Sequence, residues 1–379
     1  MTAPRIIGVQ VLAFHRQLDG RAWNPTFRWH ERRAPLVVVH TDTGAVGVGE
    51  GWSAPSDPAP VLAALATLAP SLIGRDVQAV LDDLHADTQA ALTVPHASAL
   101  SAVDMACHDA QARSQGLPLW RFLGGSTGQA RVYASGGLYR DDGDEAALAA
   151  EMTGYLAQGH RAVKMKIGAL SMAEDLARVR AVRAAIGPEA VLWADAVNQW
   201  CLPGALEGCD ALREMGVSAL QAPVPFDDVA GMARIQAHGL PVVATEAEHR
   251  PAVFAALLDA RAVGYLQFCL GLCGGFAGAA RLDDLARTYG VQSTPQTYST
   301  AVMQAATLHF AAARGNVVRA EWHGFHDHLR ALMPAPMTRV QDGVITLGDE
   351  PGLGIAVPQP GQYADGSQID LYHSCGHAS

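Results

Sequence analysis

The sequence predicts an α/β fold in which a closed parallel barrel follows a smaller antiparallel sheet with helices. From about residue 132, eight short apolar runs recur at intervals of roughly 23 to 30 residues, and the gaps between them can each hold a helix. Alternating strands and helices form right-handed βαβ units, and eight strands in about 220 residues is a barrel length. No GxGxxG or GxxxxGK[ST] turn follows any run, which disfavours a nucleotide-binding sheet. The runs are Val132–Ala134, Ala162–Met165, Val191–Ala194, Ala219–Ala222, Val242–Ala244, Tyr265–Phe268, Val291–Ser293 and Val317–Ala320.

The first 130 residues predict the smaller sheet and its helices. Ile6–Phe14 and Leu36–Glu50 are rich in β-branched residues, and Thr43-Gly44 divides the second segment into two paired strands. Apolar residues then recur at three- and four-residue spacing, which is typical of amphipathic helices. These predicted helices are Ala59–Leu72, Val77–Leu92 and Ala97–Ala112, and the clearest ones later in the chain are Asp144–Gln158, Ala173–Ile186 and Gly275–Tyr289.

Composition excludes several classes of protein. With 49% hydrophobic and 17% charged residues, the 379-residue chain can bury a large core. Its net charge of −10 argues against a nucleic-acid or anionic-membrane surface, and no run of about 18 apolar residues predicts a membrane span. The six cysteines form no CxxC pair, so reduced thiols in a cytoplasmic protein are expected. A small molecule is therefore the expected partner.

Lysine is nearly absent from the chain. Of the 27 basic residues 25 are arginine, and the two lysines both lie in Lys164-Met165-Lys166, at the end of the second run. As i and i+2 of a strand they point to the same side, into the mouth of the barrel. An ammonium can lose its proton when burial or a neighbouring cation lowers its pKa, whereas a guanidinium stays protonated. Two surface lysines are the alternative, but the use of arginine elsewhere favours a catalytic base.

Three oxygen-bearing side chains follow the next three runs. Asp195, Gln221 and Glu246 lie on successive strand ends, 26 and 25 residues apart. Neighbouring strand ends of a barrel converge, and oxygen ligands suit a hard cation such as Mg2+. A helix N-cap is the alternative role for Asp195.

Together these motifs resemble the enolase superfamily, in its mandelate racemase branch. The resemblance rests on Lys-x-Lys, Asp195-x-x-Asn198, Gln221-Ala222-Pro223 in place of an acidic-Pro motif, and Thr245-Glu246. The segment Ser101–Asp109, with Gly116-Leu117-Pro118 and Leu123-Gly124-Gly125, resembles the helical part of the family's capping domain, so the resemblance covers nearly the whole chain. It implies a (β/α)7β barrel over residues 131–349 and an α+β capping domain over residues 1–130, completed by about 350–379. A symmetric homo-oligomer is also implied.

The family uses Mg2+ to stabilise an enolate that forms when a base removes the proton α to a carboxylate. The resemblance assigns Asp195, Gln221 and Glu246 as metal ligands and Lys166 as the base, with Lys164 lowering its pKa or contacting the oxyanion. Gln221 replaces a carboxylate, which removes one negative charge and is expected to weaken the metal site. Glu248, two residues beyond Glu246, could restore the charge.

Two further departures affect the opposite face of the substrate. Cys269 stands where the family has an aspartate, and Gln296 stands where it has the paired histidine, so the His-Asp dyad is absent. Cys269 could act as an acid or base if its pKa were lowered, and Tyr298 could donate a proton. Because racemisation needs catalysts on both faces, we expect syn β-elimination of water, or an isomerisation, of a small hydroxycarboxylate such as an acid sugar.

Other residues complete the predicted pocket. Glu321 on the eighth strand matches an acidic family position, with His323 two residues on. Residues 18–33 resemble the family's specificity loop, in which Trp29 and Arg32 are candidate substrate contacts, as is Asn198 after the third strand. The spacing of His323, His326 and His328 is close to that of metal ligands, although a polar loop is the alternative.

Alternative functions remain open at this point. A racemase, epimerase or cycloisomerase would use the same lysines on a carboxylate substrate. A metal-independent lysine Schiff base is a different mechanism on the same kind of barrel. A non-catalytic ligand-binding descendant would account for the missing dyad, but it would have no need for both lysines.

Overall fold

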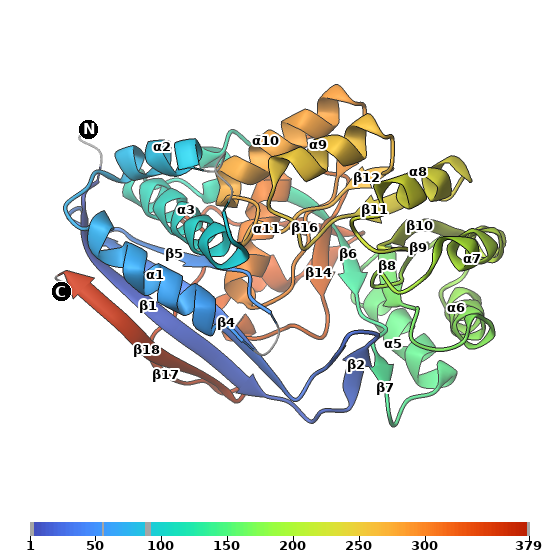
Figure 1. Cartoon of the computed structure of the whole chain (residues 1–379). Helices are drawn as coiled ribbons and strands as arrows, with labels where there is room; N and C mark the ends of the chain where they lie inside the picture. Colours follow the sequence, from blue (N-terminus) through green and yellow to red (C-terminus); the bar gives the residue numbers. More distant parts are fainter. Residues whose placement is uncertain (1–3, 55–56, 88–91, 377–379) are drawn as a thin grey trace.

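The computed structural model describes residues 4–54, 57–87 and 92–376. The predicted α/β class is confirmed: an antiparallel sheet with helices lies beside an eight-stranded barrel (Figure 1). The first and last long strands of the chain, drawn in blue and red, lie side by side in the antiparallel sheet. Residues from both ends of the chain therefore build this part of the molecule, while the proposed limits at 130/131 and 349/350 stay a prediction.

The antiparallel sheet carries helices on one face. Its order is β17-β18-β1-β4-β5, and four helices follow β5 in the described chain. The strands are β1 (Ile6–Gln17), β4 (Glu31–Thr41), β5 (Val46–Glu50), β17 (Gly361–Gln362) and β18 (Ser367–Gly376). The helices are α1 (Ala59–Leu72), α2 (Val77–Asp87), α3 (Val94–Ser114) and α4 (Leu119–Phe122). Helix α2 agrees with the predicted range as far as Asp87, and residues 88–91 of that range lie outside the described residues.

Two glycines let the sheet lie directly on helix α3. A Cβ at Gly47 would lie 1.9 Å from Ala106 O, and one at Gly49 would lie 2.0 Å from Ala102 O. Real Cβ atoms cannot approach a carbonyl oxygen so closely, so the Gly-x-Gly of β5 is a packing requirement. Helix α3 is buried on nearly all sides because it lies between this sheet and the barrel helix α10.

Eight parallel strands alternate with seven helices and close into the barrel, as the spacing of apolar runs predicts. Neighbouring strands pair in chain order, β14 pairs with β6, and a bridge between Ser293 and Val317 joins the seventh strand to the approach to the eighth. The barrel strands are β6 (Gln129–Ser135), β8 (Ala162–Lys166), β9 (Val191–Asp195), β10 (Val217–Gln221), β11 (Val242–Ala244), β12 (Tyr265–Leu266), β13 (Gln292–Ser293) and β14 (Ala320–His323). The helices are α5 (Glu145–Ala157), α6 (Met172–Ile186), α7 (Leu202–Glu214), α8 (Val229–Ala237), α9 (Pro251–Asp259), α10 (Gly275–Thr288) and α11 (Ala301–Ala313).

Local signals begin several of these helices. Ser171 and Glu174 form a reciprocal capping box at the start of α6, and Asp144 accepts a hydrogen bond from Ala147 N at the start of α5. The last strand is an exception, because the predicted run Val317–Ala320 only bridges Ser293 while the strand itself begins at Ala320. The strand therefore extends to His323, so that Glu321 lies on it, as predicted, and His323 ends it.

Short elements that the sequence did not predict surround the barrel. Part of the specificity loop pairs with a strand after β6, forming a small sheet of β2 (Ala22–Asn24), β3 (Phe27–Arg28) and β7 (Tyr139–Arg140). Strands β15 (Val340–Gln341) and β16 (Val344–Thr346) extend antiparallel from β6, after the single turns η1 (Arg330–Leu332) and η2 (Ala335–Thr338).

A buried carboxylate joins the sheet to the barrel. Glu50, at the end of β5, accepts hydrogen bonds from Thr300 N at 3.2 Å, Thr300 Oγ1 at 2.6 Å and Met303 N at 3.0 Å, at the start of α11. A negative charge at a helix N-terminus is favourable, and the charge of the buried Arg32 also attracts it. This contact holds the end of the seventh barrel strand against the sheet.

We expect Glu50→Gln to lower the free energy of unfolding by roughly 1–3 kcal/mol, because the amide replaces one of the two oxygens that accept hydrogen bonds from Thr300 and Met303 with an N–H donor. Urea unfolding followed by circular dichroism measures this effect. The control is Glu350→Gln, at an exposed position, which should change stability by less than about 0.5 kcal/mol. Equal stability of the two variants would show that Glu50 does not connect the two parts.

Candidate active site at the mouth of the barrel

A cavity of about 180 Å³ lies at the carboxyl ends of the barrel strands and is partly covered by the specificity loop. Its volume is below the roughly 300–1,000 Å³ of pockets for drug-sized ligands, so it suits a small substrate. The residues that line it are Asn24, Thr26, Phe27, Trp29, Trp52, Leu138, Lys164, Lys166, Val197, Glu246, Ala247, Gln296, Tyr298, Glu321, His323 and His326. Aromatic rings thus face a group of charged and polar side chains.

Lys164 is held by acceptors from three other strands. Its Nζ lies 2.8 Å from Glu321 Oε1, 2.8 Å from Gln221 Oε1 and 3.4 Å from Asp195 Oδ2, and the residue is fully buried. Burial acts to lower the pKa of Lys164, but the nearby negative charges, above all Glu321, outweigh it and raise this pKa well above the usual value. Lys164 is therefore a fixed cation. The mutual lowering of the two lysine pKa values that adjacent ammonium groups suggest does not hold for Lys164, because the surrounding carboxylates raise its pKa.

Lys166 lies on the same side of β8, as the i, i+2 spacing predicts, and it lines the cavity. Its Nζ lies 2.5 Å from Asp195 Oδ2. Burial acts to raise the pKa of Asp195, but the two lysines, Lys166 first, lower it below the usual value. One carboxylate thus orients both amines, and only Lys166 retains a share of exposed surface, 8% against 0% for Lys164.

Gln221 and Glu246 complete the polar floor of the cavity. The Gln221 amide nitrogen donates to Glu246 Oε2, while its oxygen accepts from Lys164. Burial and the charge of Asp195 raise the pKa of Glu246 to about 7. Glu246 therefore carries only part of a negative charge near neutral pH.

The three side chains predicted to hold Mg2+ converge, but the arrangement does not fit a magnesium site. Asp195 is in contact with both ammonium groups, and Gln221 turns an N–H donor toward Glu246. Mg2+ requires oxygen ligands in near-octahedral geometry, so an N–H facing the neighbouring ligand is incompatible with it. Across residues 4–54, 57–87 and 92–376, no group of three or more His, Cys, Asp or Glu could hold a metal ion.

Glu248 does not replace the missing carboxylate. Its Oε2 lies 2.6 Å from Arg250 Nη2, and its Oε1 accepts from the backbone nitrogens of His249 and Arg250 and from Arg250 Nε. Burial acts to raise the pKa of Glu248, but the Arg250 hydrogen bonds lower it below the usual value. The negative charge of Glu248 is thus paired with Arg250, and Glu248 does not line the cavity.

The positions of the absent dyad offer no base. Cys269 is 1% exposed, and burial raises the pKa of its thiol to about 12. The predicted role of Cys269 as an acid or base depended on a lowered pKa, so the structure corrects it. Gln296, bridged to Cys269 through the backbone, does line the cavity, and its Oε1 is buried without a hydrogen-bond partner among the described residues.

Two predicted substrate contacts, Arg32 and Asn198, lie outside the cavity lining. Arg32 is fully buried, donates to Tyr298 O at 3.2 Å and to Ser299 Oγ at 2.8 Å, and lies 4.4 Å from the Tyr298 ring centroid. Arg32 therefore supports the segment that carries Tyr298 and Ser299, and it does not line the cavity. Asn198 lies outside the lining too, because the chain turns so that Val197 faces the cavity, while Asn198 N donates to Ala222 O at 2.7 Å.

The remaining predicted residues do meet at the cavity. Trp29, Tyr298, Glu321 and His323 all line it. Tyr298 Oη is buried without a hydrogen-bond partner in the part of the chain that the structure describes. Burial raises the pKa of this phenol above its usual value, so it stays protonated and can donate a hydrogen bond.

Sequence reasoning missed several residues of the site. Gln267 is fully buried beneath the floor, with its amide nitrogen 3.4 Å from Gln221 Oε1 and 3.5 Å from Tyr133 Oη. Its signal was a polar residue within the apolar run Tyr265–Phe268. Trp52 and Leu138 carried no comparable signal, because they reach the cavity from loops outside the strand pattern.

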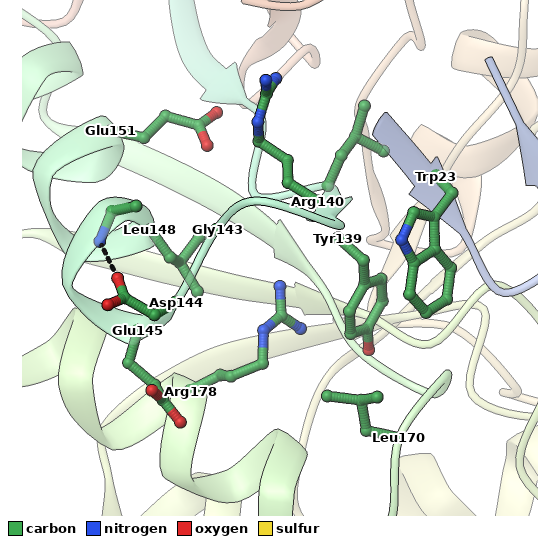
Figure 2. A pocket seen from close by; sticks show the side chains of 12 residues that line it. Trp23, Tyr139, Arg140, Gly143, Asp144, Glu145, Leu148, Glu151, Leu170 and Arg178 are labelled. Carbon is green, nitrogen blue, oxygen red and sulfur yellow. Dashed lines mark hydrogen bonds between the residues drawn. The ribbon is translucent and has the colours of Figure 1, made fainter. Parts of the chain in front are cut away.

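A larger hollow of about 640 Å³ lies outside the barrel mouth, between β7 and helices α5 and α6 (Figure 2). There Trp23 stacks on Tyr139 at 4.7 Å, and Arg178 lies 3.9 Å from the Tyr139 ring centroid. Arg178 donates to Lys166 O and Gly137 O and pairs with Asp175, so its guanidinium supports the end of β8. We assign the chemistry to the smaller cavity, because both lysines face it.

Comparisons with known proteins give matches over most of the chain. Residues 26–124 match the family described as "Mandelate racemase / muconate lactonizing enzyme, N-terminal domain", and residues 147–360 match "Enolase C-terminal domain-like". D-galactarolactone cycloisomerase of Agrobacterium fabrum is 32% identical, over 93% of this chain and 96% of that protein. Arabinonate dehydratase of Saccharolobus solfataricus is 26% identical, over 86% and 89%. The crystal structure of a racemase from Streptomyces coelicolor A3(2) with bound magnesium has a TM-score of 0.84 at 26% identity, covering 93% of this chain and 97% of that one.

We expect Cys269 to resist iodoacetamide at about pH 8, because its thiol is buried and its pKa is raised to about 12. Cys201 is exposed and serves as the control that should be alkylated. Peptide mass spectrometry of the folded protein measures both sites. Alkylation of Cys269 as fast as Cys201 would return it to the candidate acids and bases.

Proposed function

Because this chain belongs to the mandelate racemase and muconate lactonizing enzyme family of the enolase superfamily, we propose that it dehydrates a small hydroxycarboxylate by syn β-elimination. The chain is an enzyme of the lyase or isomerase type, with a carboxylate as substrate. The observation that carries the proposal is the pair of lysines at the cavity: Lys164 is fixed as a cation, and Lys166 lines the cavity beside Asp195. An acid sugar is the expected substrate class.

In the proposed reaction, Lys166 in its neutral amine form removes the proton α to the substrate carboxylate. The electron pair of that C–H bond moves toward the carboxylate, where negative charge develops as the enolate forms. The pair then returns to form the double bond while the β-hydroxyl leaves, and the Lys166 ammonium gives its proton to this group on the same face. The products are an enol, which tautomerises to a 2-keto acid, and water.

Lys164 stabilises this sequence by its charge alone. Its ammonium stays protonated among Glu321, Gln221 and Asp195, so it can offset negative charge on the enolate without exchanging protons. Glu321 in turn accepts from Thr297 N at 3.0 Å, which ties it to the loop that carries Gln296 and Tyr298. Among the described residues, Gln296 Oε1 and Tyr298 Oη on that loop are buried without a hydrogen-bond partner, and both residues line the cavity, which supports contacts with substrate hydroxyls.

The opposite face supports elimination over racemisation. Cys269 has a raised pKa and Gln296 cannot take a proton, so the proton has to be handled from the side of Lys166. An isomerisation that returns the proton to that side is the second candidate, favoured by the similarity to a relative named a cycloisomerase. When the reaction runs in deuterium oxide, deuterium that enters the product from only one face would support either reaction.

Two alternatives have direct tests. Borohydride trapping with keto acids would reveal a Schiff base as a stable adduct on Lys164 or Lys166 and would overturn the proposed elimination. A non-catalytic role would be supported if a Lys166→Met variant turned over every accepted substrate as the unmodified enzyme does.

Assembly and location stay predictions. A homo-oligomer is expected from the family, and a cytoplasmic location from the absence of CxxC pairs. None of the helices in the described part of the chain is long and apolar enough to cross a membrane.

We expect Lys166→Arg to fold but to lose activity by about 10²–10⁴-fold, because arginine keeps the positive charge beside Asp195 and cannot act as a base. A screen of acid sugars and amino-acid derivatives in deuterium oxide, read by mass spectrometry and NMR, measures proton exchange and turnover. Unfolding curves of both proteins serve as the control. Undiminished exchange in the variant would contradict Lys166 as the base.

Gln221→Glu should raise Mg2+ affinity by about three decades, because a charge at ligand distance is worth roughly 4 kcal/mol at an effective dielectric near 20. The same change removes the N–H donor that faces Glu246. Calorimetric titration with MgCl2 compares the unmodified protein, this variant and the exposed control Gln199→Glu. Tight Mg2+ binding by the unmodified protein would contradict the misfit described above.

A further inference from the structure

Three histidines follow one another at the end of the eighth barrel strand. His323, His326 and His328 are buried, and His326 Nδ1 lies 3.4 Å from His328 Nε2. Arg16, from strand β1 of the antiparallel sheet, lies with its Nη1 3.1 Å from His328 Nδ1. The row thus runs from a cation outside the barrel to the cavity, where His326 and His323 are lining residues.

Donors of known type set the tautomers of all three rings. A guanidinium can only donate, so His328 Nδ1 accepts from Arg16 and the proton of the neutral ring lies on Nε2. His328 Nε2–H then donates to His326 Nδ1, which leaves the proton of His326 on its own Nε2. His323 also has its proton on Nε2, for a different reason: its Nδ1 accepts from the backbone nitrogens of Phe325 at 3.2 Å and His326 at 3.3 Å.

The rings are held neutral and in fixed planes. Burial lowers the pKa of His323 and of His328 to about 3, and it lowers the pKa of His326 well below the usual value. The rings of Trp29, Tyr298 and Phe325 pack edge-on around His326, at centroid distances of 4.7, 5.0 and 5.1 Å. A neutral imidazole in a fixed orientation is a hydrogen-bond donor whose direction does not change with its protonation state.

Each cavity-lining ring leaves one nitrogen unused. Among the described residues, neither His326 Nε2 nor His323 Nε2 has a hydrogen-bond partner, whereas both Nδ1 atoms are occupied. Both free nitrogens carry the proton under the tautomers derived above. A ligand in the cavity therefore meets two N–H donors from this side and the two lysine side chains of β8.

We propose that His326 and His323 bind acceptor oxygens of the substrate through their Nε2–H groups, and that Arg16 acts as a positioning residue that sets the tautomer of His326 through His328. This inference rests on the proposed function and narrows its substrate class. The two histidine N–H donors come in addition to the groups that bind the substrate carboxylate, so the substrate needs further oxygens to accept from them. The site therefore selects a polyhydroxy carboxylate over an alkyl acid of the same length. A site built to donate hydrogen bonds rejects an analogue that lacks the acceptors.

The experiment uses protein with ¹⁵N in its histidine rings. The protein carries Lys166→Arg, so that a bound substrate is not turned over during the measurement. Imidazole ¹⁵N shifts distinguish the two tautomers and the protonated form, and His→Gln variants assign the three rings. We expect the Nε2–H tautomer at all three near pH 7. A mixture of five- and six-carbon aldonates should shift His326 and His323, whereas pentanoate and hexanoate should not.

Matched variants separate binding from folding. Glutamine can place an N–H near the position of Nε2, whereas asparagine replaces only the Nδ1 side, so His326→Gln should retain aldonate binding and His326→Asn should weaken it about tenfold. Arg16→Lys should keep the His326 tautomer, and Arg16→Met should yield a mixture. An Nδ1–H tautomer at His326, equal responses to aldonate and alkyl acid, or equal binding by the two His326 variants would each overturn the inference. Failure of Lys166 as a base would leave these readouts unchanged, so the two proposals fail separately.

Discussion

The site depends on the balance of charge among four buried side chains at the strand ends. Lys164 and Lys166 on β8 share Asp195 on β9, and Lys164 also pairs with Glu321 on β14. Removing one partner from a buried ion pair typically costs 3–5 kcal/mol, because the other charge stays desolvated. The strands can therefore meet at these positions only with both signs present. The same balance keeps one lysine protonated and places the other at the cavity.

This balance also gives the single change at Gln221 its meaning. A carboxylate at that position would add negative charge beside Asp195 and Glu246, and a divalent cation would then compensate it. With glutamine, the amide oxygen accepts from Lys164 and the amide nitrogen donates to Glu246, so the polar floor is satisfied internally. The family relationship predicts that the site binds a metal, whereas these hydrogen bonds among its own side chains predict weak metal affinity. The chemistry proposed for the two lysines includes no step through a metal.

Much of the fold follows from periodicity. The eight apolar runs mark the eight barrel strands because most of their residues are buried, and the two lysines share one side because the strand period is two. The predictions that failed concern effects of tertiary packing. Arg32 belongs to a segment that resembles a specificity loop, yet in the structure it lies in strand β4 and its buried guanidinium contacts Tyr298 and Ser299. Cys269 stands where the resemblance implies a catalytic aspartate, yet burial raises its pKa.

The role of the three histidines also depends on tertiary contacts that the sequence does not reveal. The spacing of His323, His326 and His328 indicated only a metal site or a polar loop, because the sequence does not reveal that Arg16, 312 residues before His328, lies against the last ring. Gln267 escaped notice for a similar reason, since a polar residue in an apolar run has no meaning until Tyr133 and Gln221 are placed beside it.

The central claim is that Lys164 is a fixed ammonium within this cluster. Because the chain has only two lysines, NMR of protein with ¹⁵N at the lysine Nζ yields two side-chain signals, which a Lys166→Arg variant assigns. We predict that near pH 7 the Lys164 signal is that of an ammonium whose protons exchange slowly with water, and that Glu321→Gln speeds this exchange. A Lys164 signal at the position of a neutral amine, or one that Glu321→Gln leaves unchanged, would contradict the account.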